Sequence, residues 1–139
     1  MAVPKPRQAV AFRQEISRLN LESIAAFNRG DVTACAGYYA EEATILLPDR
    51  PPIKGRTAIQ EFLEGFSASG VKLMPVEPMA IMSGGDLGCC AGTYAFQVPS
   101  VHGASVAGAG KFVTVFHQQR DGSWKAVIDS FFADAGPEQ

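Results

Sequence analysis

The stretch FNRGDVTACAGYYAEEATILL, residues 27–47, contains the signals that best define the fold. Gly30 is placed to end a helix, since glycine readily adopts the left-handed conformation that follows a last helical turn. Asp31 can then cap a second, shorter helix that runs to about Tyr39. Beyond two glutamates, the apolar run Ala43–Leu47 has the character of a short strand. The stretch therefore predicts a helix end, a short helix and a strand in succession.

Helices are also predicted on both sides of this stretch. From about Gln8, apolar residues recur every three to five positions, which is the spacing of one buried helix face. These residues are Phe12, Ile16, Leu19, Ile24 and Phe27. Downstream, Thr57 and Gln60 have the spacing of a capping box, and Gly70 provides a stop signal. We expect a third helix over about residues 58–69.

Beyond the third helix, the apolar period changes to two and turn signals recur, which predicts strands. Four strands are expected, near residues 71–82, 87–98, 111–119 and 124–132. Pro75 and Pro78 favour a bent or edge position for the first of them. Helices followed by an antiparallel sheet form the α+β arrangement, in which helices cover one sheet face. We expect one domain over residues 9–134, a loose arm over 1–8 and a tail over 135–139.

The composition is that of an ordinary globular protein. Of the 139 residues, 47% are hydrophobic and 19% are charged, and the formal net charge is −2. No run of Lys or Arg could neutralise a series of phosphates, so nucleic acid is not an expected partner. No apolar run could cross a bilayer, and the N-terminus lacks the apolar stretch of a signal peptide. Three cysteines, with Cys89 and Cys90 adjacent, argue against a disulfide framework. We expect a cytoplasmic protein without a membrane partner.

Five short motifs occur in a characteristic order between residues 16 and 134. They are Phe27–Asp31, Tyr38–Ala43, Ile53–Arg56, Gly92–Tyr94, and a last group made of Gly110–Phe112, Asp121–Lys125 and Asp129. In this order they resemble the nuclear-transport-factor-2-like superfamily, specifically its small bacterial ketosteroid-isomerase-like and SnoaL-like members. The resemblance implies a cone-shaped, curved antiparallel sheet wrapped on three N-terminal helices, a cystatin-like α+β roll around an apolar pocket.

The resemblance also implies that an enzyme of this fold places a carboxylate, tyrosine or histidine in the pocket for proton transfer. Asp129 is the strongest candidate, because it lies in an apolar strand where loss of hydration would raise its pKa toward that of a useful base or acid. The alternative is a structural carboxylate that faces solvent or pairs with a neighbour such as Lys111. Tyr38 and Tyr94 could each hydrogen-bond a carbonyl or enolate oxygen, or be core tyrosines with satisfied hydroxyls.

The predicted pocket lining is largely apolar. Its candidate residues are Leu46, Phe62, Phe66, Thr93, Phe96, Lys111 and Val113. Thr93 and Tyr94 alternate along one strand, so only one of them can face the pocket. The resemblance implies a tyrosine and two acidic groups for a steroid isomerase, and here only Asp129 is a candidate acidic member. No metal-ligand spacing, GxGxxG motif or phosphate-binding loop occurs, and we infer no cofactor.

Two functions follow from these candidates. The first is a cofactor-independent isomerase, cyclase or dehydratase that moves a proton on a small hydrophobic carbonyl or polyketide-like compound, with Asp129 as the base. The second is a non-catalytic module that binds a small ligand or assembles through its sheet. The orientation of Asp129 would separate them. Under both we expect a homodimer through the open face of the sheet, with Val113, Val115, Val127 and Phe131 as candidate interface residues.

Overall fold

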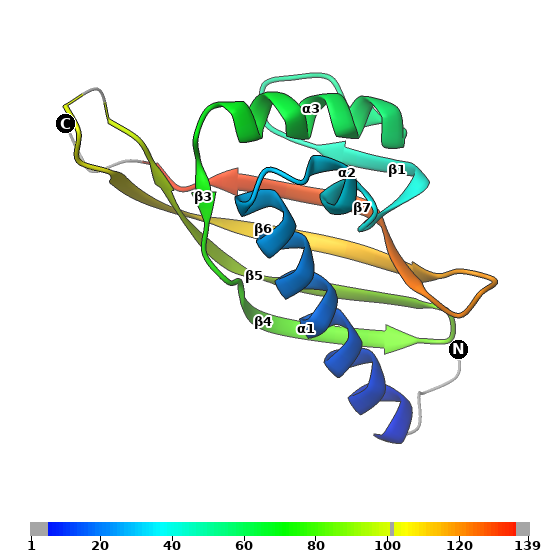
Figure 1. The fold of residues 1–139 in the computed structure, drawn as a ribbon. Coiled ribbons are helices and arrows are strands. Elements are labelled where there is room, and N and C mark those ends of the chain that lie inside the picture. The colour runs from blue at the N-terminus through cyan, green and yellow to red at the C-terminus, as the bar shows by residue number, and fades with distance from the viewer. Residues whose placement is uncertain (1–5, 101, 136–139) are drawn as a thin grey trace.

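The computed structural model describes residues 6–100 and 102–135. Within these residues, two helices, a pair of strands and a third helix precede the rest of a seven-stranded sheet. The three helices and the later strands follow the predicted order, and β2 is a strand that the sequence did not predict. The elements are α1 (Pro6–Asn28), α2 (Val32–Ala36), β1 (Tyr39–Leu46), β2 (Ile53–Lys54), α3 (Arg56–Ala68), β3 (Lys72–Leu73), β4 (Glu77–Gly84), β5 (Leu87–Val98), β6 (Val106–Gln118) and β7 (Trp124–Ala133). Figure 1 shows their arrangement. None of the described helices is long and apolar enough to span a membrane.

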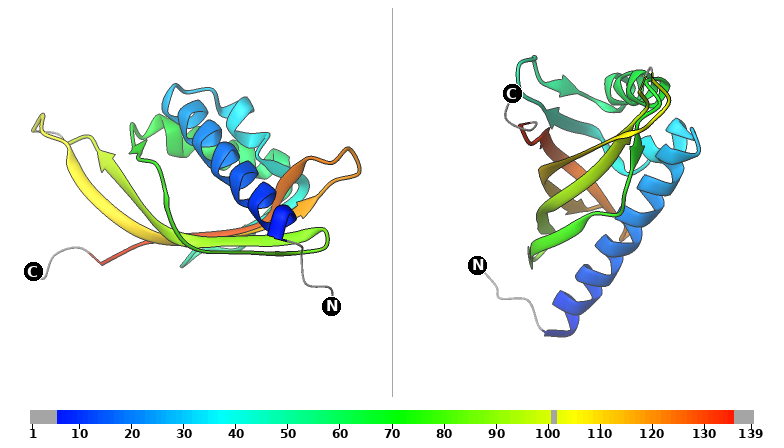
Figure 2. Two further views of the ribbon diagram at one scale, coloured as in Figure 1. Left: turned by 90° about the horizontal axis from the view of Figure 1, so that it is seen from below. Right: turned by 90° about the vertical axis from the view of Figure 1, so that its left-hand side faces the viewer.

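The strands form one curled sheet in the order β2–β1–β7–β6–β5–β3, and β4 also pairs with β5. Figure 2 shows the helices on the hollow side of the curl. The predicted α+β roll is confirmed, with one correction. The pair β1–β7 is parallel, so the sheet is mixed and not antiparallel throughout. The two strands are joined by most of the chain, and no hairpin therefore fixes their relative direction.

The helix boundaries follow local backbone chemistry. Gly30 has a φ of 81° and ends α1, and the Asp31 side chain accepts a hydrogen bond of 3.1 Å from Ala34 N at the start of α2. At the other end, α1 begins at Pro6, because proline fits the first turn of a helix. The predicted loose arm is therefore wrong for residues 6–8, while residues 1–5 lie outside the described part of the chain.

The start of α3 differs from the expected capping box. The helix begins at Arg56, and its N-cap is Gly55, which has a φ of 89° and provides no side-chain cap. Gln60 instead donates from Nε2 to Thr33 Oγ1 across 3.3 Å, which ties α3 to α2. Because the helix starts at Arg56, two residues earlier than predicted, Thr57 lies inside the first turn. The capping-box prediction was wrong in mechanism, although the helix exists.

The first predicted strand of the sheet is broken in two by its prolines. Pro75 separates β3 from β4, and the register of β4 against β5 shifts between Pro78 and Ala80. Both short strands pair with β5 alone, so they lie at the edge of the sheet. The predicted bend and edge position are confirmed, since proline lacks the N–H that a central strand would need.

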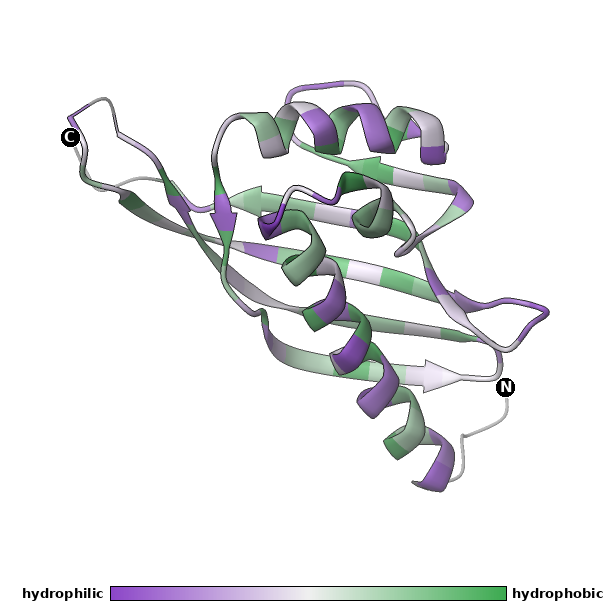
Figure 3. Ribbon diagram, viewed as in Figure 1, coloured by the Kyte–Doolittle hydropathy of each residue, from purple (hydrophilic) through white to green (hydrophobic). Residues whose placement is uncertain are grey.

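The core lies between the helices and the inner face of the sheet. Its fully buried large side chains are Ile16 and Phe27 of α1, Ile45 of β1, Ile59 of α3, Cys90 of β5 and Phe116 of β6. Figure 3 shows polar and apolar bands along α1, as expected for a helix with one buried side. No helix among the described residues covers the outer sheet face. Large apolar side chains are exposed there, among them Leu46, Met82, Val113, Ile128 and Phe132.

Candidate functional site

A cavity of about 120 Å³, partly open to solvent, lies between the three helices and the inner face of the sheet. Its wall is mainly apolar, and seven of its residues are aromatic: Phe27, Tyr38, Tyr39, Phe66, Tyr94, Phe112 and Phe131. Its polar residues are Asn20, Ser23, Thr114 and Asp129, together with the thiol of Cys35. Apolar walls with a few convergent polar groups are the usual form of a small-molecule site.

Asp129 lies at the buried end of this cavity, and only 7% of its surface is exposed. Each of its carboxylate oxygens accepts one hydrogen bond from a side chain. The Tyr39 hydroxyl donates to Oδ2 over 2.7 Å, and the Thr114 hydroxyl donates to Oδ1 over 2.9 Å. The three side chains come from β7, β1 and β6, and Thr114 is the direct cross-strand partner of Asp129. The carboxyl group is therefore held by two strands on either side of its own.

The alternation of β7 explains why the carboxyl group points inward. Asp129 and Phe131 face the cavity, whereas Ile128 and Phe132 face outward and are exposed. The pairing of β6 with β7 shifts at Val127, where Phe116 is opposite Ala126 and Val115 is opposite Ile128. This extra residue is a bulge, which changes the side to which the following side chains point. A bulge cannot be identified from alternation in a single sequence.

Burial is the main influence on the Asp129 carboxyl group. It raises the pKa of Asp129 above its ordinary value, and the hydrogen bonds from Tyr39, Thr114 and Ser130 N oppose that rise without cancelling it. No Lys, Arg or His lines the cavity among the described residues. The alternative in which Asp129 pairs with Lys111 was wrong, because Lys111 Nζ bonds Asp134 at the surface. A desolvated carboxyl group without a cationic partner is the usual form of a general base or acid.

Tyr39 is the site residue that the sequence reasoning missed. Burial, followed by the nearby Asp129 carboxylate, raises the pKa of Tyr39 well above its ordinary value, so the phenol remains a donor across the working pH range. Its neighbour Tyr38 was favoured instead, and the adjacency of the two tyrosines was the available signal. Both tyrosines line the cavity, and only the structure shows that Tyr39 is the one whose hydroxyl reaches Asp129.

Tyr38 lines the cavity but is engaged elsewhere. Its hydroxyl donates to Asn20 Oδ1 over 2.7 Å, and burial raises the pKa of Tyr38 well above its ordinary value. Asn20 Nδ2 is a buried side-chain atom without a hydrogen-bond partner in the described part of the chain. The expected role of Tyr38 as a donor to a ligand would therefore require it to exchange partners.

Tyr94 lies near the open end of the cavity beside Met74 and Val76, which are partly exposed. Its hydroxyl makes no hydrogen bond to a described residue, so it is available to a ligand. Burial is the largest cause that raises the pKa of Tyr94, and the carboxylates of Asp134 and Asp129 add to it. Its ring lies against Gly110, its cross-strand partner, where an added methyl group would come within 2.5 Å of Tyr94 Cζ. Glycine at this position lets the ring lie flat on the next strand.

The sequence matches the SnoaL-like domain over residues 21–127. The chain belongs to the SnoaL-like family. No curated protein is a significant match to the sequence. Solved structures with the same fold include a ketosteroid isomerase-like protein from Erwinia carotovora atroseptica, with a TM-score of 0.76, 16% identity, and coverage of 88% of this chain and 96% of that chain.

Two further solved structures are similar to this SnoaL-like protein. An NTF2-like protein with a cystatin-like fold from Novosphingobium aromaticivorans has a TM-score of 0.77 at 20% identity, covering 94% of this chain and 86% of that one. A protein provisionally described as a dehydratase of the NTF2-like family, from Streptomyces avermitilis, has a TM-score of 0.76 at 15% identity, covering 95% and 100%. At these identities the comparisons establish a shared fold.

Most of the predicted lining of the SnoaL-like pocket lies elsewhere, and only Phe66 belongs to the cavity that contains Asp129. Four of the predicted residues lie on the outer sheet face or its edge: Leu46, Thr93, Lys111 and Val113. Each is adjacent in its strand to a residue that faces inward, and neighbouring residues of a strand face opposite sides. Phe62 lines a separate groove, where Arg50 lies 5.4 Å from its ring centre. Phe96 packs against Gly108 in the β5–β6 hairpin.

The described residues contain no group of three His, Cys, Asp or Glu side chains placed to bind a metal ion. Of the pair Thr93 and Tyr94, it is Tyr94 that faces the cavity. The candidate site of this SnoaL-like protein therefore consists of the Asp129 carboxyl group with its donors Tyr39 and Thr114, the Asn20–Tyr38 pair, and the unpaired Tyr94 phenol. This arrangement can accept a proton at Asp129 and donate a hydrogen bond from Tyr94.

Proposed function

We propose that this SnoaL-like protein is a cofactor-independent isomerase, cyclase or dehydratase that transfers a proton on a small, uncharged, apolar carbonyl compound. The proposal rests on the burial of the Asp129 carboxyl group, which faces an apolar cavity and has no cationic partner among the described residues. A base in such surroundings is stronger than the same group in water. A carboxylate alone can move a proton between carbon and oxygen, and the proposal therefore needs no cofactor.

Asp129 is the proposed base. Tyr39 and Thr114 each occupy one position on a carboxylate oxygen, and the Ser130 N–H contributes a further hydrogen bond. A carboxylate has about four lone-pair positions, so a position remains for a substrate proton. The two donors hold the carboxyl plane in one orientation, so little rearrangement is needed before reaction. Removal of a proton from the carbon next to a carbonyl would create an enolate, and the protonated Asp129 could return that proton to another carbon or to a leaving oxygen.

Tyr94 is the proposed donor to the carbonyl or enolate oxygen. Its phenol is unpaired among the described residues and lines the same cavity as Asp129, and its raised pKa keeps the proton on the phenol. A hydrogen bond to the oxygen that gains negative charge lowers the barrier to enolisation. Tyr38 is the less suitable donor, since its hydroxyl already binds Asn20.

The cavity also limits the ligand. A volume of about 120 Å³ is close to that of an engineered cavity of about 150 Å³ that binds benzene. One ring or a short acyl chain would fill it, and the rest of a larger molecule would extend through the open end. A ligand with a carboxylate or phosphate at the buried end would place a second negative charge near Asp129 with no cation to balance it. The proposed substrate is therefore neutral.

Deuterium exchange tests the proposal without knowledge of the natural substrate. Small cyclic and aryl ketones are incubated in D₂O with the protein, and loss of the α-proton signal is followed by NMR. We expect the wild type to accelerate exchange for at least one ketone, and Asp129→Asn to lower that rate by about 100-fold or more. Asp86→Asn, which removes an exposed carboxylate from the turn between β4 and β5, outside the cavity lining, should keep the rate. Equal rates for wild type and Asp129→Asn would contradict the proposed role.

Homodimerisation through the outer sheet face is proposed in addition. The exposed side chains of Val113, Ile128 and Phe132 lie on the same face of β6 and β7, with Val113 diagonal to the other two, and they form an apolar surface that is interrupted by Ser130 and Lys111. Two of the residues expected at this interface are placed differently, since Phe131 faces the cavity and Val127 is the bulge residue. A solution mass of twice the chain mass of 14.8 kDa is expected, and a monomer at micromolar concentration would contradict dimerisation.

A further inference from the structure

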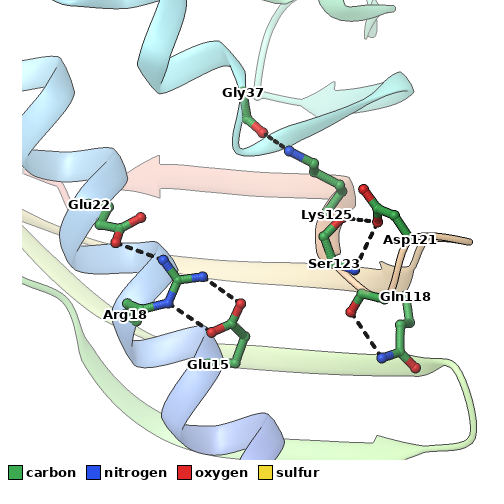
Figure 4. Close-up of polar contacts among 9 residues, drawn as sticks. Glu15, Arg18, Glu22, Gly37, Gln118, Asp121, Ser123 and Lys125 are labelled. Atoms are coloured by element: carbon green, nitrogen blue, oxygen red, sulfur yellow. Dashed lines mark hydrogen bonds and ion pairs between the residues drawn. The ribbon is translucent and has the colours of Figure 1, made fainter.

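Side chains from other elements bind the main chain around the cavity tyrosines Tyr38 and Tyr39. Arg56, the first residue of α3, donates from Nε over 3.1 Å and from Nη2 over 2.6 Å to the carbonyl oxygen of Tyr39. Two residues earlier in the chain, the Gly37 carbonyl accepts a 2.6 Å hydrogen bond from Lys125 Nζ, as Figure 4 shows. Two cationic side chains thus bind the short segment that positions Tyr38 and Tyr39.

This segment lies where the strand ladder is irregular. Tyr39 is opposite Ala126 in β7, the next paired residue of β1 is Thr44, and the register shifts between them. The Tyr38 carbonyl still accepts from Ala126 N over 2.9 Å. Two N–H groups of the charged Arg56 side chain converge on the single carbonyl oxygen of Tyr39. This pair of bonds restricts rotation of the peptide more than one neutral bond would.

The sequence motif Ile53–Arg56 explains why the Arg56 side chain lies next to the Tyr39 carbonyl. Gly55 has a φ of 89°, a left-handed value that side chains rarely adopt, and its N–H donates to the Ala43 carbonyl over 2.8 Å. The chain can therefore turn from β2 directly into α3 while it remains bound to β1. This places the first side chain of α3 against the start of β1, next to the tyrosine that reaches Asp129.

We propose that Arg56 is a positioning residue, which fixes the main chain of Tyr39 so that the Tyr39 hydroxyl remains on Asp129 Oδ2. The proposal rests on the proposed function in one respect, since it takes Asp129 to be the group that transfers the proton. The contact itself can be tested without activity. Loss of Arg56 should let the Tyr39 main chain move and lengthen or break its hydroxyl bond to Asp129, whereas Thr114 on β6 keeps its own bond.

The surroundings of Asp129 make this bond measurable. The titratable side chains that line the cavity with it are Cys35 from α2, Tyr38 from the turn before β1, Tyr39 from β1 and Tyr94 from β5. Burial raises the pKa of each of them, so all are neutral near pH 7 and none changes charge while Asp129 titrates. The hydrogen bond from Tyr39 lowers the pKa of Asp129. Weakening that bond should therefore raise the pKa of Asp129.

The test is a double-mutant cycle read by the titration of the Asp129 carboxyl carbon in NMR, with Asp129→Asn to assign the signal. The four proteins are wild type, Tyr39→Phe, Arg56→Gln and the double variant. We expect Tyr39→Phe to raise the pKa of Asp129. Introduced into the wild type, Arg56→Gln should raise that pKa by at least half as much, and introduced into Tyr39→Phe it should cause no further rise. Lys54→Gln, which removes an exposed cation from the same motif, should change nothing.

Several results would overturn the proposal. An equal rise in both backgrounds would mean that Arg56 acts through its charge, and no rise in either would mean that Tyr39 is fixed by other contacts. If Arg56→Gln does not fold, Arg56→Lys takes its place, and the same comparison between backgrounds decides. Absence of ketone exchange by the wild type would contradict the proposed function alone, because the pKa cycle does not depend on turnover.

Discussion

The inner and outer faces of β6 and β7 differ in chemistry although they are built from alternate residues of the same two strands. On the inner face, Thr114 is opposite Asp129, and these residues are 3% and 7% exposed. On the outer face, Val115 is opposite Ile128, and Ile128 is 44% exposed. The carboxylate is buried and the apolar side chain is exposed, the reverse of the usual preference. Such an inversion suggests that each face meets a partner, a ligand inside and another chain outside.

The largest effect is expected from moving the carboxylate from one face to the other. The double variant Asp129→Ser, Ser130→Asp keeps the composition but places the carboxyl group outside the cavity. We expect ketone exchange to fall by about 100-fold or more, to the rate of Asp129→Asn, since the base no longer faces the ligand. The deuterium exchange assay measures this directly. Retention of the wild-type rate would mean that inward placement of the carboxylate is unimportant.

A charge on the outer face should weaken the proposed dimer. Ile128→Arg would bury a guanidinium against apolar side chains of the second copy, and we expect the dissociation constant to rise by about 100-fold. Leu21→Arg is the matched control, because Leu21 is an exposed apolar residue of α1 and not of the sheet. Sedimentation over a range of concentrations would measure both variants. Equal dissociation constants for the two would place the interface elsewhere.

The buried carboxylate should also lower stability in a pH-dependent way. Burial raises the pKa of Asp129 in the folded chain above that of the unfolded chain, about 3.9. The free energy of unfolding therefore decreases as the pH rises from the unfolded-state pKa to the folded-state pKa, and the decrease is complete above the folded-state pKa. Each pKa unit of difference contributes about 1.4 kcal/mol.

Asp129→Asn should lack this pH-dependent loss. We expect its free energy of unfolding, relative to the wild type, to increase between pH 4 and pH 8, as measured by urea denaturation at each pH. Because the other titratable groups are common to both proteins, their contributions cancel in the difference. A constant difference, or one that decreases with pH, would show that the pKa of Asp129 is not raised.

The smallest effect is expected from removing one phenol at the open end of the cavity. Tyr94→Phe should lower the exchange rate by about tenfold, less than the loss for a fully buried donor, because water reaches this end. Tyr38→Phe is the comparison, since it removes a hydroxyl that binds Asn20. It should reduce stability by about 1 kcal/mol with a smaller effect on the rate. A larger rate loss for Tyr38→Phe would reverse the two roles.

The sequence was sufficient for the architecture because the architecture depends on local signals. Gly30 and Asp31 define the exit of one helix and the start of the next, and the prolines near residue 75 break the first long strand. The cavity lining depends on the face to which each strand residue points, and a single sequence does not show which of two alternating sets of residues faces inward. In β7 a bulge at Val127 also changes that face without any local signal. Asp129 was identified because a carboxylate inside an apolar strand is conspicuous, whereas Tyr39 needed a partner 90 residues away.

The most direct test of the account is the pH titration of the Asp129 carboxyl carbon in the wild-type protein, assigned with Asp129→Asn. The account predicts a pKa above the free value of about 3.9, since burial outweighs the bonds from Tyr39 and Thr114. A pKa at or below that value would mean a solvated or ion-paired carboxylate. It would contradict Asp129 as the base and favour a non-catalytic binding module.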